Sequence, residues 1–496
     1  MLRVRFLSKR RPLLPAAIDL WPAVAIEGDR ESHSEHSALL ALSRIRAGHL
    51  FWPVPRHDAI ARTEVTLTPW RSGWRLASGQ SLSTVRPETI RQIRTDGGAR
   101  IPLFAVLAGL AGTAEEACRS LRRSRWICPW TGRDLSIEDG LGALCFLRDR
   151  AAENASPVVT VGLSSWKRRA VSPFLTGPHG RPSHRKVSMP SPSTRRIHWG
   201  ADETGADMRM EDGFLRSVGL GVRHTPPSSL IVTAEPLHFD TRQRTGFDRL
   251  VDSTVFDEPL LARACRLRHR IRQCDLSKYN LPDARSALPM SRGREAVLVP
   301  GQVEEDASLR LGVDGPSSNV ALLQRAREVF PDAFLLYKPH PDVRTGLRPG
   351  QLRINEVLDV ADAVDDGAGL SACLGWCDRV ATFTSLTGFE ALLRGKRVTT
   401  FGRPFYAGRG LTDDHDPPDG RKHLSLDALV AAALILYPRY IDPQTCLPAP
   451  VEQIVDRFVE ERRRRPGFAG QLRAVYRFLA SEFRHGLPGL RRGARP

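Results

Sequence analysis

Short apolar runs alternate with longer amphipathic segments over residues 295–465. Runs of four or five residues rich in valine, leucine and phenylalanine predict buried strands, and apolar residues spaced three or four apart predict helices. The expected strands are Ala296–Pro300, Ala333–Tyr337, Arg379–Phe383 and Arg397–Phe401, and the expected helices are Asn319–Phe330, Leu386–Arg394, Leu424–Tyr437 and Pro450–Arg463. Strands that alternate with helices at this spacing indicate βαβ units and a parallel sheet.

The pattern upstream predicts a second α/β region over residues 126–294. An amphipathic helix is expected over Ser136–Glu153, a buried strand over Val158–Val161, and a very basic helix over Pro259–Tyr279. Residues 177–194 are rich in proline, serine and histidine, which is typical of a loop.

Two terminal regions complete the expected organisation. Residues 1–125 form an N-terminal region of unknown role, interpretable as a reduced module, and residues 466–496 form a basic tail. The N-terminal region predicts two short strands and one alanine-rich helix, at Thr63–Pro69, Gly73–Leu76 and Ile101–Cys118.

Composition narrows the class of protein. Of the 496 residues, 41% are apolar, which is too many for a wholly disordered chain. No apolar run reaches the roughly 20 residues of a membrane helix. Asp19 and several prolines interrupt the apolar N-terminal stretch, which argues against a secretory signal. Eight scattered cysteines show no disulfide framework, so we expect a reducing cytoplasm.

The charge is strongly basic. Lysine and arginine number 73 against 55 acidic residues, the formal net charge is +18, and only seven of the basic residues are lysine. Two interpretations stay open: a solvated arginine-rich surface, and attraction to an anionic membrane face or an anionic substrate. A nucleic-acid partner is not expected, because no zinc-finger or RNA-binding aromatic signature accompanies the charge.

The segment Lys338-Pro339-His340-Pro341 directly follows an expected strand. Ligands of open parallel sheets bind beyond the carboxyl ends of the strands, and prolines fix the backbone there. Both Lys338 and His340 can donate hydrogen bonds to a phosphate. A rigid surface turn is the alternative interpretation of this segment.

A second candidate phosphate site lies at residues 384–388, between an expected strand and an expected helix. Hydroxyls and free amides at a helix N-terminus bind anions, although serine and threonine also serve as ordinary helix caps. Glu390, one turn into that helix, is either a contact to a ribose hydroxyl or a solvated carboxylate. A P-loop and a dinucleotide-binding glycine motif are both missing from the sequence, which disfavours a P-loop ATPase and a dinucleotide dehydrogenase.

Two adjacent acids, Glu211 and Asp212, precede a glycine and form the candidate catalytic carboxylates. Glycosyl transfer uses carboxylates because they stabilise or covalently trap an oxocarbenium-like centre; a polar turn is the alternative. Arg216 and Ser217 are placed to bind an anionic sugar, since arginine matches a carboxylate bidentately. Weaker candidates are Asp240 and Glu304 as acids and Arg242 as a contact to the sugar or acceptor. The glycine- and aromatic-rich segment Gly402–Thr412 predicts a shaped binding loop.

Several segments together resemble the signatures of the capsule polysaccharide β-Kdo transferases of the KpsC type. They are MEDGFLRSVGLG at residues 210–221, KPHPD at 338–342, TSLTGFEALLRGK at 384–396 and GRPFYAGRGLT at 402–412, with WTGR at 130–133 and YPRY at 437–440 as flanking matches. The resemblance covers roughly residues 125–445.

This resemblance implies an α/β, GT-B-like fold with two Rossmann-like halves around a cleft. Residues 126–294 would be the acceptor-side half, and residues 295–465 the half that binds the sugar nucleotide. It implies CMP-Kdo as donor, a lysophosphatidylglycerol-type glycolipid as acceptor, other capsule-assembly proteins as partners, and no metal or other cofactor. It also implies a retaining reaction at the cytoplasmic face of the inner membrane.

The same resemblance implies roles for individual residues. Asp212 is the expected central carboxylate, with Glu211 as the second choice, and Arg216 is expected to hold the Kdo carboxylate. The expected donor-binding residues are Lys338, His340, Pro341, Thr384, Ser385, Gly388 and Glu390, and the expected sugar or acceptor contacts are Arg216, Ser217 and Arg242.

Some features depart from the family pattern. Many members carry two such modules in tandem, whereas each motif occurs once here. Arg409 stands where tryptophan is usual, and Ala201-Asp202 stands where a basic pair often follows Trp199-Gly200; we expect these departures to bear on acceptor choice. Two alternative functions stay open, a sialyltransferase-like CMP-sugar transferase and a non-catalytic capsule-assembly subunit.

Overall fold

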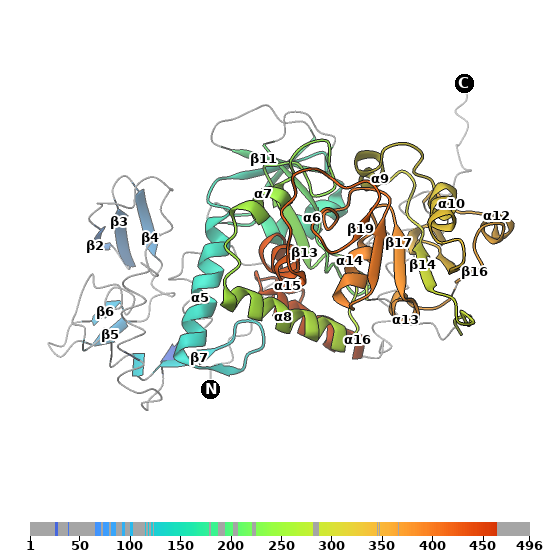
Figure 1. The fold of residues 1–496 in the computed structure, drawn as a ribbon. Helices are drawn as coiled ribbons and strands as arrows, with labels where there is room; N and C mark the ends of the chain where they lie inside the picture. Colours follow the sequence, from blue (N-terminus) through green and yellow to red (C-terminus); the bar gives the residue numbers. More distant parts are fainter. Residues whose placement is uncertain are drawn as a thin grey trace, which may run out of the picture. The chain divides into compact units, whose positions relative to one another are not determined.

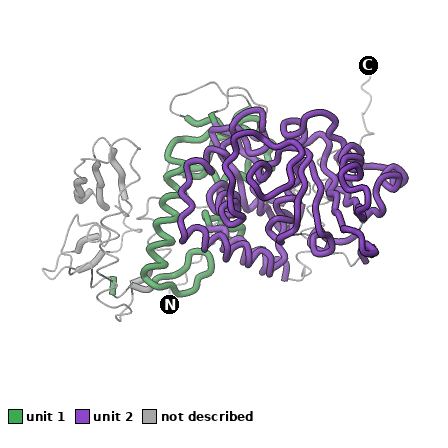
Figure 2. Tube along the Cα trace, viewed as in Figure 1, with its two compact units in different colours: residues 1–198, 205–207, 441–449 green, residues 199–204, 208–440, 450–496 purple. Residues whose placement is uncertain are grey.

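A computed structural model describes residues 124–463 except 178–179, 187–193, 202–206, 221–224, 281–286, 345, 347 and 366. It also describes residues 25–27, 38, 65–70, 73–78, 81–85, 92–94, 100–102, 115, 118 and 121–122. The chain divides into two compact units (Figure 2). The first consists of residues 1–198, 205–207 and 441–449, and the second of residues 199–204, 208–440 and 450–496. The predicted domain boundaries follow the motifs and stay a prediction, and the predicted tail lies outside the described residues.

The first unit contains a parallel strand arrangement that the valine-rich pattern predicts. Strand β9 (Val158–Val161) is buried throughout and pairs in parallel with β10 (Ser183–Arg185) and β11 (Arg195–Trp199). Helix α5 (Ile137–Ala152) begins after Ser136, whose side chain accepts a hydrogen bond from the Asp139 amide. The remaining elements are β1 (Ala25–Glu27), β2 (Val65–Trp70), β3 (Gly73–Ser78), β4 (Ser81–Val85), β5 (Gln92–Arg94), β6 (Arg100–Pro102), β7 (Ser124–Ile127), β8 (Asp134–Leu135) and α6 (Ser165–Leu175).

Two sequence predictions need correction here. The predicted helix Ile101–Cys118 starts too early, because Ile101 belongs to strand β6 and pairs with Ile93 of β5. Residues 103–114 lie outside the described residues. The predicted loop 177–194 contains β10, since its backbone extends the edge of β9. The predicted strands near residues 63–76 are confirmed as β2 and β3.

The second unit is built on a six-stranded parallel sheet with the order β16-β15-β14-β17-β18-β19. Figure 1 shows β14, β17 and β19 among the strands of this sheet. The strand bounds are β14 (Ala296–Pro300), β15 (Phe334–Lys338), β16 (Ala363–Val364), β17 (Arg379–Thr382), β18 (Arg397–Thr400) and β19 (Asp413–Asp414). All five residues of β14 are buried, which explains its uninterrupted apolar sequence. The predicted parallel sheet is confirmed.

Register brings the ends of the central strands to one edge. Pro300 of β14 lies opposite Lys338 of β15, and Leu298 lies opposite Val380 of β17. The segments that follow β14, β15 and β17 therefore leave the sheet at the same carboxyl edge. A core of valine, leucine and phenylalanine side chains packs beneath it, among them Val297, Leu335 and Phe383.

Helices and a short antiparallel arrangement complete the second unit. β13 (Ser229–Thr233) pairs in antiparallel fashion with β12 (Met208–Asp212) and with β20 (Arg439–Tyr440). The helices are α7 (Gly246–Ser253), α8 (Glu258–Gln273), α9 (Ala307–Gly312), α10 (Asn319–Val329), α11 (Pro341–Arg344), α12 (Ile354–Leu358), α13 (Leu370–Trp376), α14 (Leu386–Leu393), α15 (Leu426–Val430), the π-helix Ala431–Leu436 and α16 (Val451–Arg463). Within the described part of the chain, no helix has the length and apolar content needed to cross a membrane.

The end of α8 differs from its prediction in a way that matters for the site. The basic helix was predicted to run to Tyr279, but it ends at Gln273, and Asp275 adopts a left-handed conformation with φ 53°. Asn280 does the same with φ 47°. The chain over residues 275–280 is therefore a turn, because left-handed residues cannot continue a right-handed helix.

Candidate functional site

The carboxylate pair lies at the end of β12, where the backbone turns away from the sheet. Asp212 is the last residue of the strand and faces Leu230 of β13. Gly213 follows, and a Cβ at this position would lie 2.3 Å from the Ser229 hydroxyl oxygen. Only glycine allows the two strands to approach so closely. Phe214 then stacks on Phe405 with ring centroids 4.5 Å apart, which fixes the turn after Asp212.

The two acids have different surroundings. Oδ2 of Asp212 accepts a hydrogen bond from Arg216 Nε at 2.7 Å, while its Oδ1 is buried and has no hydrogen-bond partner among the described residues. Oε1 of Glu211 accepts a hydrogen bond from the backbone amide of Asp212 at 2.9 Å. Arg216 therefore anchors one oxygen of Asp212, and no described residue satisfies the other.

Two of the three guanidinium nitrogens of Arg216, Nε and Nη1, donate hydrogen bonds within the protein. Its side chain is 3% exposed, and Nη1 donates to Ser217 Oγ and to the Thr225 carbonyl at 3.0 and 2.9 Å. The Ser217 hydroxyl donates to the Gly219 carbonyl at 2.8 Å. Both residues support Asp212 from a buried position, and their expected contact with the sugar carboxylate stays a prediction.

Arg242 also has a partner on its own loop. It forms a two-bond ion pair with Asp240, at 2.8 and 2.9 Å, and its side chain is 61% exposed. Glu304, the other weak acid candidate, accepts a hydrogen bond from the Asn319 amide at 2.8 Å. Asp240 and Glu304 therefore act as local structural groups in this structure.

The turn over residues 275–280 lies against the carboxylate segment. The carbonyl of Lys278 accepts hydrogen bonds from the amides of Arg216 and Ser217, at 3.0 and 3.2 Å. The amide of Lys278 donates to Glu390 Oε1 at 2.7 Å. Sequence reasoning missed Lys278 because it placed this residue in a helix; the rarity of lysine in the chain was the available signal.

The ammonium of Lys278 interacts with several charged groups at once. Burial favours its neutral form, but interactions with Tyr279, Asp212 and Glu211 outweigh that effect, so the pKa of Lys278 is raised. The positive charge of Lys278 in turn contributes to a lowered pKa for His340, where burial is the largest cause. Lys278 thus interacts electrostatically with both carboxylates and with His340, which follows β15.

Burial lowers the pKa of His340 and so favours the neutral ring, whose proton position follows from its contacts. Nδ1 of the ring accepts a hydrogen bond from the Asp342 amide at 3.2 Å. A neutral imidazole that accepts at Nδ1 carries its proton on Nε2. His340 therefore presents an N–H donor at the carboxyl edge of the sheet, and Pro341 starts helix α11 directly after it.

Lys338 has partners of its own at this edge. Its ammonium donates to Asp365 Oδ2 at 2.6 Å and to the Ala368 carbonyl at 2.5 Å, and its side chain is 12% exposed. The ion pair holds the pKa of Asp365 below its ordinary value, although burial opposes this. Its predicted phosphate contact stays a prediction, and in this structure Lys338 ties β15 to the loop before α13.

The start of α14 carries the second predicted phosphate segment. Gln302, which follows β14, donates to Thr384 Oγ1 at 3.0 Å and accepts from the Thr384 amide at 3.1 Å. Ser385 is the helix cap and accepts a hydrogen bond from the Thr387 amide. The structure therefore brings the predicted segments after β14 and β17 into direct contact.

Glu390 lies inside this helix and is 5% exposed. Burial raises its pKa, while Arg394 and the Lys278 amide oppose the shift. Because its Oε1 binds the Lys278 backbone, Glu390 positions the turn that carries Lys278; its predicted ribose contact stays a prediction.

Gly388 packs against the ring of Tyr406, so a larger residue at this position should destabilise the protein. Replacing Gly388 with alanine is expected to lower the free energy of unfolding by about 1–3 kcal/mol, because the new Cβ would lie 2.2 Å from Tyr406 Oη. The Tyr406 hydroxyl donates to the Ser385 carbonyl at 2.5 Å, so the ring cannot move away without losing this bond. Urea unfolding measures the change. Gly375→Ala in α13 is the matched control, since nothing lies within 4 Å of its Cβ, and equal losses in the two variants would contradict the prediction.

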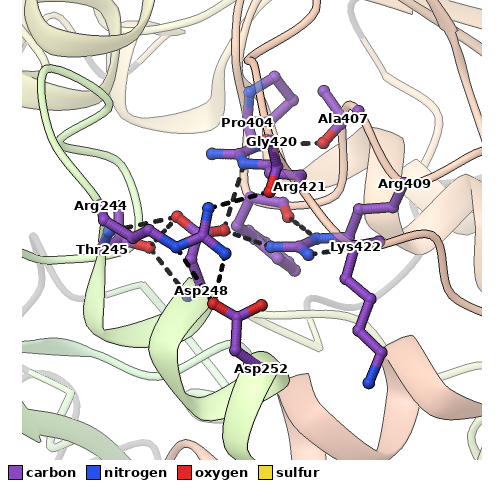
Figure 3. Close-up of polar contacts among 12 residues, drawn as sticks. Arg244, Thr245, Asp248, Asp252, Pro404, Ala407, Arg409, Gly420, Arg421 and Lys422 are labelled. Atoms are coloured by element: carbon purple, nitrogen blue, oxygen red, sulfur yellow. Dashed lines mark hydrogen bonds and ion pairs between the residues drawn. The ribbon is translucent and has the colours of Figure 1, made fainter.

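The glycine-rich segment Gly402–Thr412 borders an open pocket of about 420 Å³, which is lined by Gly408, Gly410, Thr412, Asp414, Pro417, Pro418, Asp419, Gly420, Arg421 and His423. Arg409 is 1% exposed and donates to Asp248 Oδ1 of α7 at 2.5 Å (Figure 3). Arg421 contacts the same oxygen at 3.2 Å. Arg409 therefore fixes the loop to α7 from a buried position. Its expected effect on acceptor choice stays a prediction.

Together these features define an α/β protein with a carboxylate, an ammonium and an imidazole N–H near the carboxyl edge of a parallel sheet. A family model described as "Capsule polysaccharide biosynthesis protein" matches residues 190–440, and the chain belongs to this family. The predicted family resemblance is confirmed.

Relatives and solved structures agree with this assignment. The chain is 35% identical over 394 residues to the capsule polysaccharide modification protein LipA of Neisseria meningitidis serogroup B, covering 76% of this chain and 54% of LipA. It is 42% identical over 239 residues to the lipopolysaccharide-processing protein LpsZ of Rhizobium meliloti, covering 47% of this chain and 54% of LpsZ. The chain thus spans about half the length of the curated relatives it matches.

Two solved structures of Thermosulfurimonas dismutans KpsC resemble this fold. The β-Kdo 2,7 transferase matches with a TM-score of 0.51 and 30% identity, covering 62% of this chain and 100% of its own. The β-Kdo 2,4 transferase matches with a TM-score of 0.55 and 30% identity, covering 61% and 98%. The predicted α/β, GT-B-like fold class is confirmed by these matches.

Proposed function

We propose that the protein is a glycosyltransferase that transfers Kdo from CMP-Kdo, in β linkage, onto a glycolipid linker during capsular polysaccharide synthesis. One observation carries the proposal: Asp212 is held by Arg216 through one oxygen, and its other oxygen is buried with no hydrogen-bond partner among the described residues. A carboxylate arranged in this way suits nucleophilic attack on a sugar carbon. The 30% identity to two β-Kdo transferases over nearly their whole lengths supports the choice of sugar.

The residues then take distinct roles. Asp212 Oδ1 forms a bond to the anomeric carbon while the bond from that carbon to the phosphate oxygen breaks, and CMP leaves with the bonding electrons. The acceptor hydroxyl next displaces Asp212 and releases its proton to the medium, which restores the carboxylate. Two displacements retain the configuration of the donor. His340 donates from Nε2 to the departing phosphate, and the N-terminus of α14 contributes partial positive charge.

Other parts of the proposal come from the family resemblance. We propose a lysophosphatidylglycerol-type acceptor, contacts with other capsule-assembly proteins, a location at the cytoplasmic face of the inner membrane, and a reaction without a metal or other cofactor. The basic charge of the chain favours an anionic membrane face or substrate.

A transfer assay tests the proposed function. The protein receives CMP-Kdo, generated during the assay because it is labile, with synthetic acceptors ending in zero, one or two β-Kdo residues, and products are identified by mass spectrometry. We expect one Kdo to be added to one of these acceptors. Transfer from CMP-sialic acid instead would favour the sialyltransferase-like alternative. Failure of transfer together with failure of CMP to raise the unfolding temperature would favour a non-catalytic subunit, since a ligand of the native state must stabilise it.

A further inference from the structure

The proposed donor carries a carboxylate and a phosphate, which call for positively charged groups in the site. Several of the basic residues predicted for this role already have partners within the protein. Nε and Nη1 of Arg216 donate to Asp212, Ser217 and Thr225. Lys338 is paired with Asp365, and Arg242 with Asp240. A substrate anion would compete with these existing partners.

Lys278 differs from these groups. Among the residues that the structure describes, none forms a hydrogen bond or an ion pair with its ammonium; the nearest recorded contact is the ring of Tyr279, with Nζ 5.2 Å from the centroid. The side chain is only partly exposed. A partly desolvated ammonium without a direct acceptor is a strong binding group for an anion, because few waters compete for it.

The backbone of Lys278 is held from two sides, which places the side chain accurately. Its carbonyl receives the amides of Arg216 and Ser217, and its amide donates to Glu390. Asn280 adds a further hydrogen bond from its side-chain amide to the Ser217 carbonyl at 3.1 Å. A positioned binding group loses little entropy when a ligand arrives.

The charges around the ammonium show which part of the site it belongs to. The backbone of Lys278 contacts the segment that follows Asp212, through the amides of Arg216 and Ser217. Its ammonium interacts electrostatically with Asp212, Glu211 and Asp306, and its charge contributes to the lowered pKa of His340. Lys278 therefore belongs to the same charged region as the proposed attacking carboxylate.

We propose that the ammonium of Lys278 binds an anionic group on the reacting carbon of the donor sugar. This inference rests on the proposed function, because it takes Asp212 as the group that approaches that carbon. In a CMP-activated 2-keto acid sugar, the reacting carbon bears both a carboxylate and the phosphate oxygen. An ammonium can bind either the carboxylate or the phosphate. In this proposal Lys278 has the role of binding the sugar's anionic group, which the family resemblance had assigned to Arg216.

Two substitutions at Lys278 test the proposal, one that removes the positive charge and one that keeps it. Lys278→Met is expected to lower kcat/KM for the donor by roughly 10- to 100-fold, the loss typical of one charged hydrogen bond, whereas Lys278→Arg should recover part of it. Lys186→Met, at an exposed lysine of the first unit, is the matched control. Urea unfolding of all variants separates a binding defect from a folding defect.

Calorimetric titration with CMP identifies the anion. A loss of CMP affinity in Lys278→Met would assign the phosphate, and unchanged CMP affinity with impaired use of the intact donor would assign the sugar carboxylate. If Lys278→Met has the CMP affinity and the kcat/KM of the wild type, the proposal is overturned. If the wild type binds CMP and transfers no Kdo, and Lys278→Met loses CMP affinity, the proposed function is refuted and the role of Lys278 stands. If the wild type binds neither CMP nor the donor, the proposed function and the role of Lys278 are both overturned.

Discussion

Replacing Asp212 with asparagine is expected to lower turnover by about 10³-fold or more, because the amide cannot form the covalent bond proposed for Oδ1. The substitution preserves the size of a side chain whose Oδ1 is buried and has no hydrogen-bond partner in the described part of the chain. It removes the charge that faces Arg216, so a modest loss of stability is expected beside the catalytic defect. Transfer from CMP-Kdo, followed by mass spectrometry, measures the turnover.

Glu211→Gln is the matched control for this prediction. Glu211 accepts a hydrogen bond from the Asp212 amide through Oε1, and glutamine retains an oxygen that can do the same. We therefore expect a smaller loss of turnover in Glu211→Gln than in Asp212→Asn. Full turnover in Asp212→Asn, or an equal loss in both variants, would remove Asp212 from the nucleophile role.

Replacing Asp248 with alanine is expected to lower the free energy of unfolding by about 3–5 kcal/mol. Asp248 is the shared partner of Arg409 and Arg421, and all three side chains are almost fully buried (Figure 3). Without the carboxylate, two guanidinium groups stay desolvated near each other and lose the acid that pairs with both of them. Burial already lowers the pKa of Arg421 to about 10, which reflects the cost of its charge at this position.

Asp252→Ala supplies the control for Asp248→Ala. Asp252 lies in the same helix α7 and pairs with Arg244, but both side chains are about 40% exposed. Exposed pairs contribute about 0–1 kcal/mol, so this variant should unfold nearly like the wild type in urea. A loss for Asp248→Ala no larger than that for Asp252→Ala would show that the buried cluster does not stabilise the protein.

The same cluster predicts a pH dependence with a definite sign. Burial favours the protonated form of Asp248, but Arg421, Thr245 and Arg409 outweigh it, so the pKa of Asp248 is lower in the folded than in the unfolded chain. Its contribution is therefore fully present above the unfolded pKa of about 4 and is lost as the pH falls through the folded pKa. The stability difference between the wild type and Asp248→Ala should shrink progressively below about pH 4.

Much of the parallel sheet could be predicted from sequence because its strands are buried throughout. The expected strand Ala296–Pro300 coincides with β14, and the expected helix Leu386–Arg394 differs from α14 by a single residue at its end. The prediction missed the end of α8, although the arginine-rich sequence stops at Gln273 and Asp275, Ser277 and Asn280 are residue types typical of turns. That turn depends on contacts with Glu390 and Arg216, which are distant in sequence.

By itself, the sequence determined the class of fold, the family motifs and the edge of the sheet where those motifs gather, because these depend on local periodicity and on residues adjacent in the chain. Only the tertiary structure decided how the side chains pair. It paired Arg216 and Lys338 with internal partners, buried Arg409 against Asp248 and packed Gly388 against Tyr406. It also left the ammonium of Lys278 without a hydrogen bond or ion pair to any residue that the structure describes. The physical reason is that a charged side chain takes whichever opposite charge the fold brings within about 4 Å, and most of these partners lie far away along the chain.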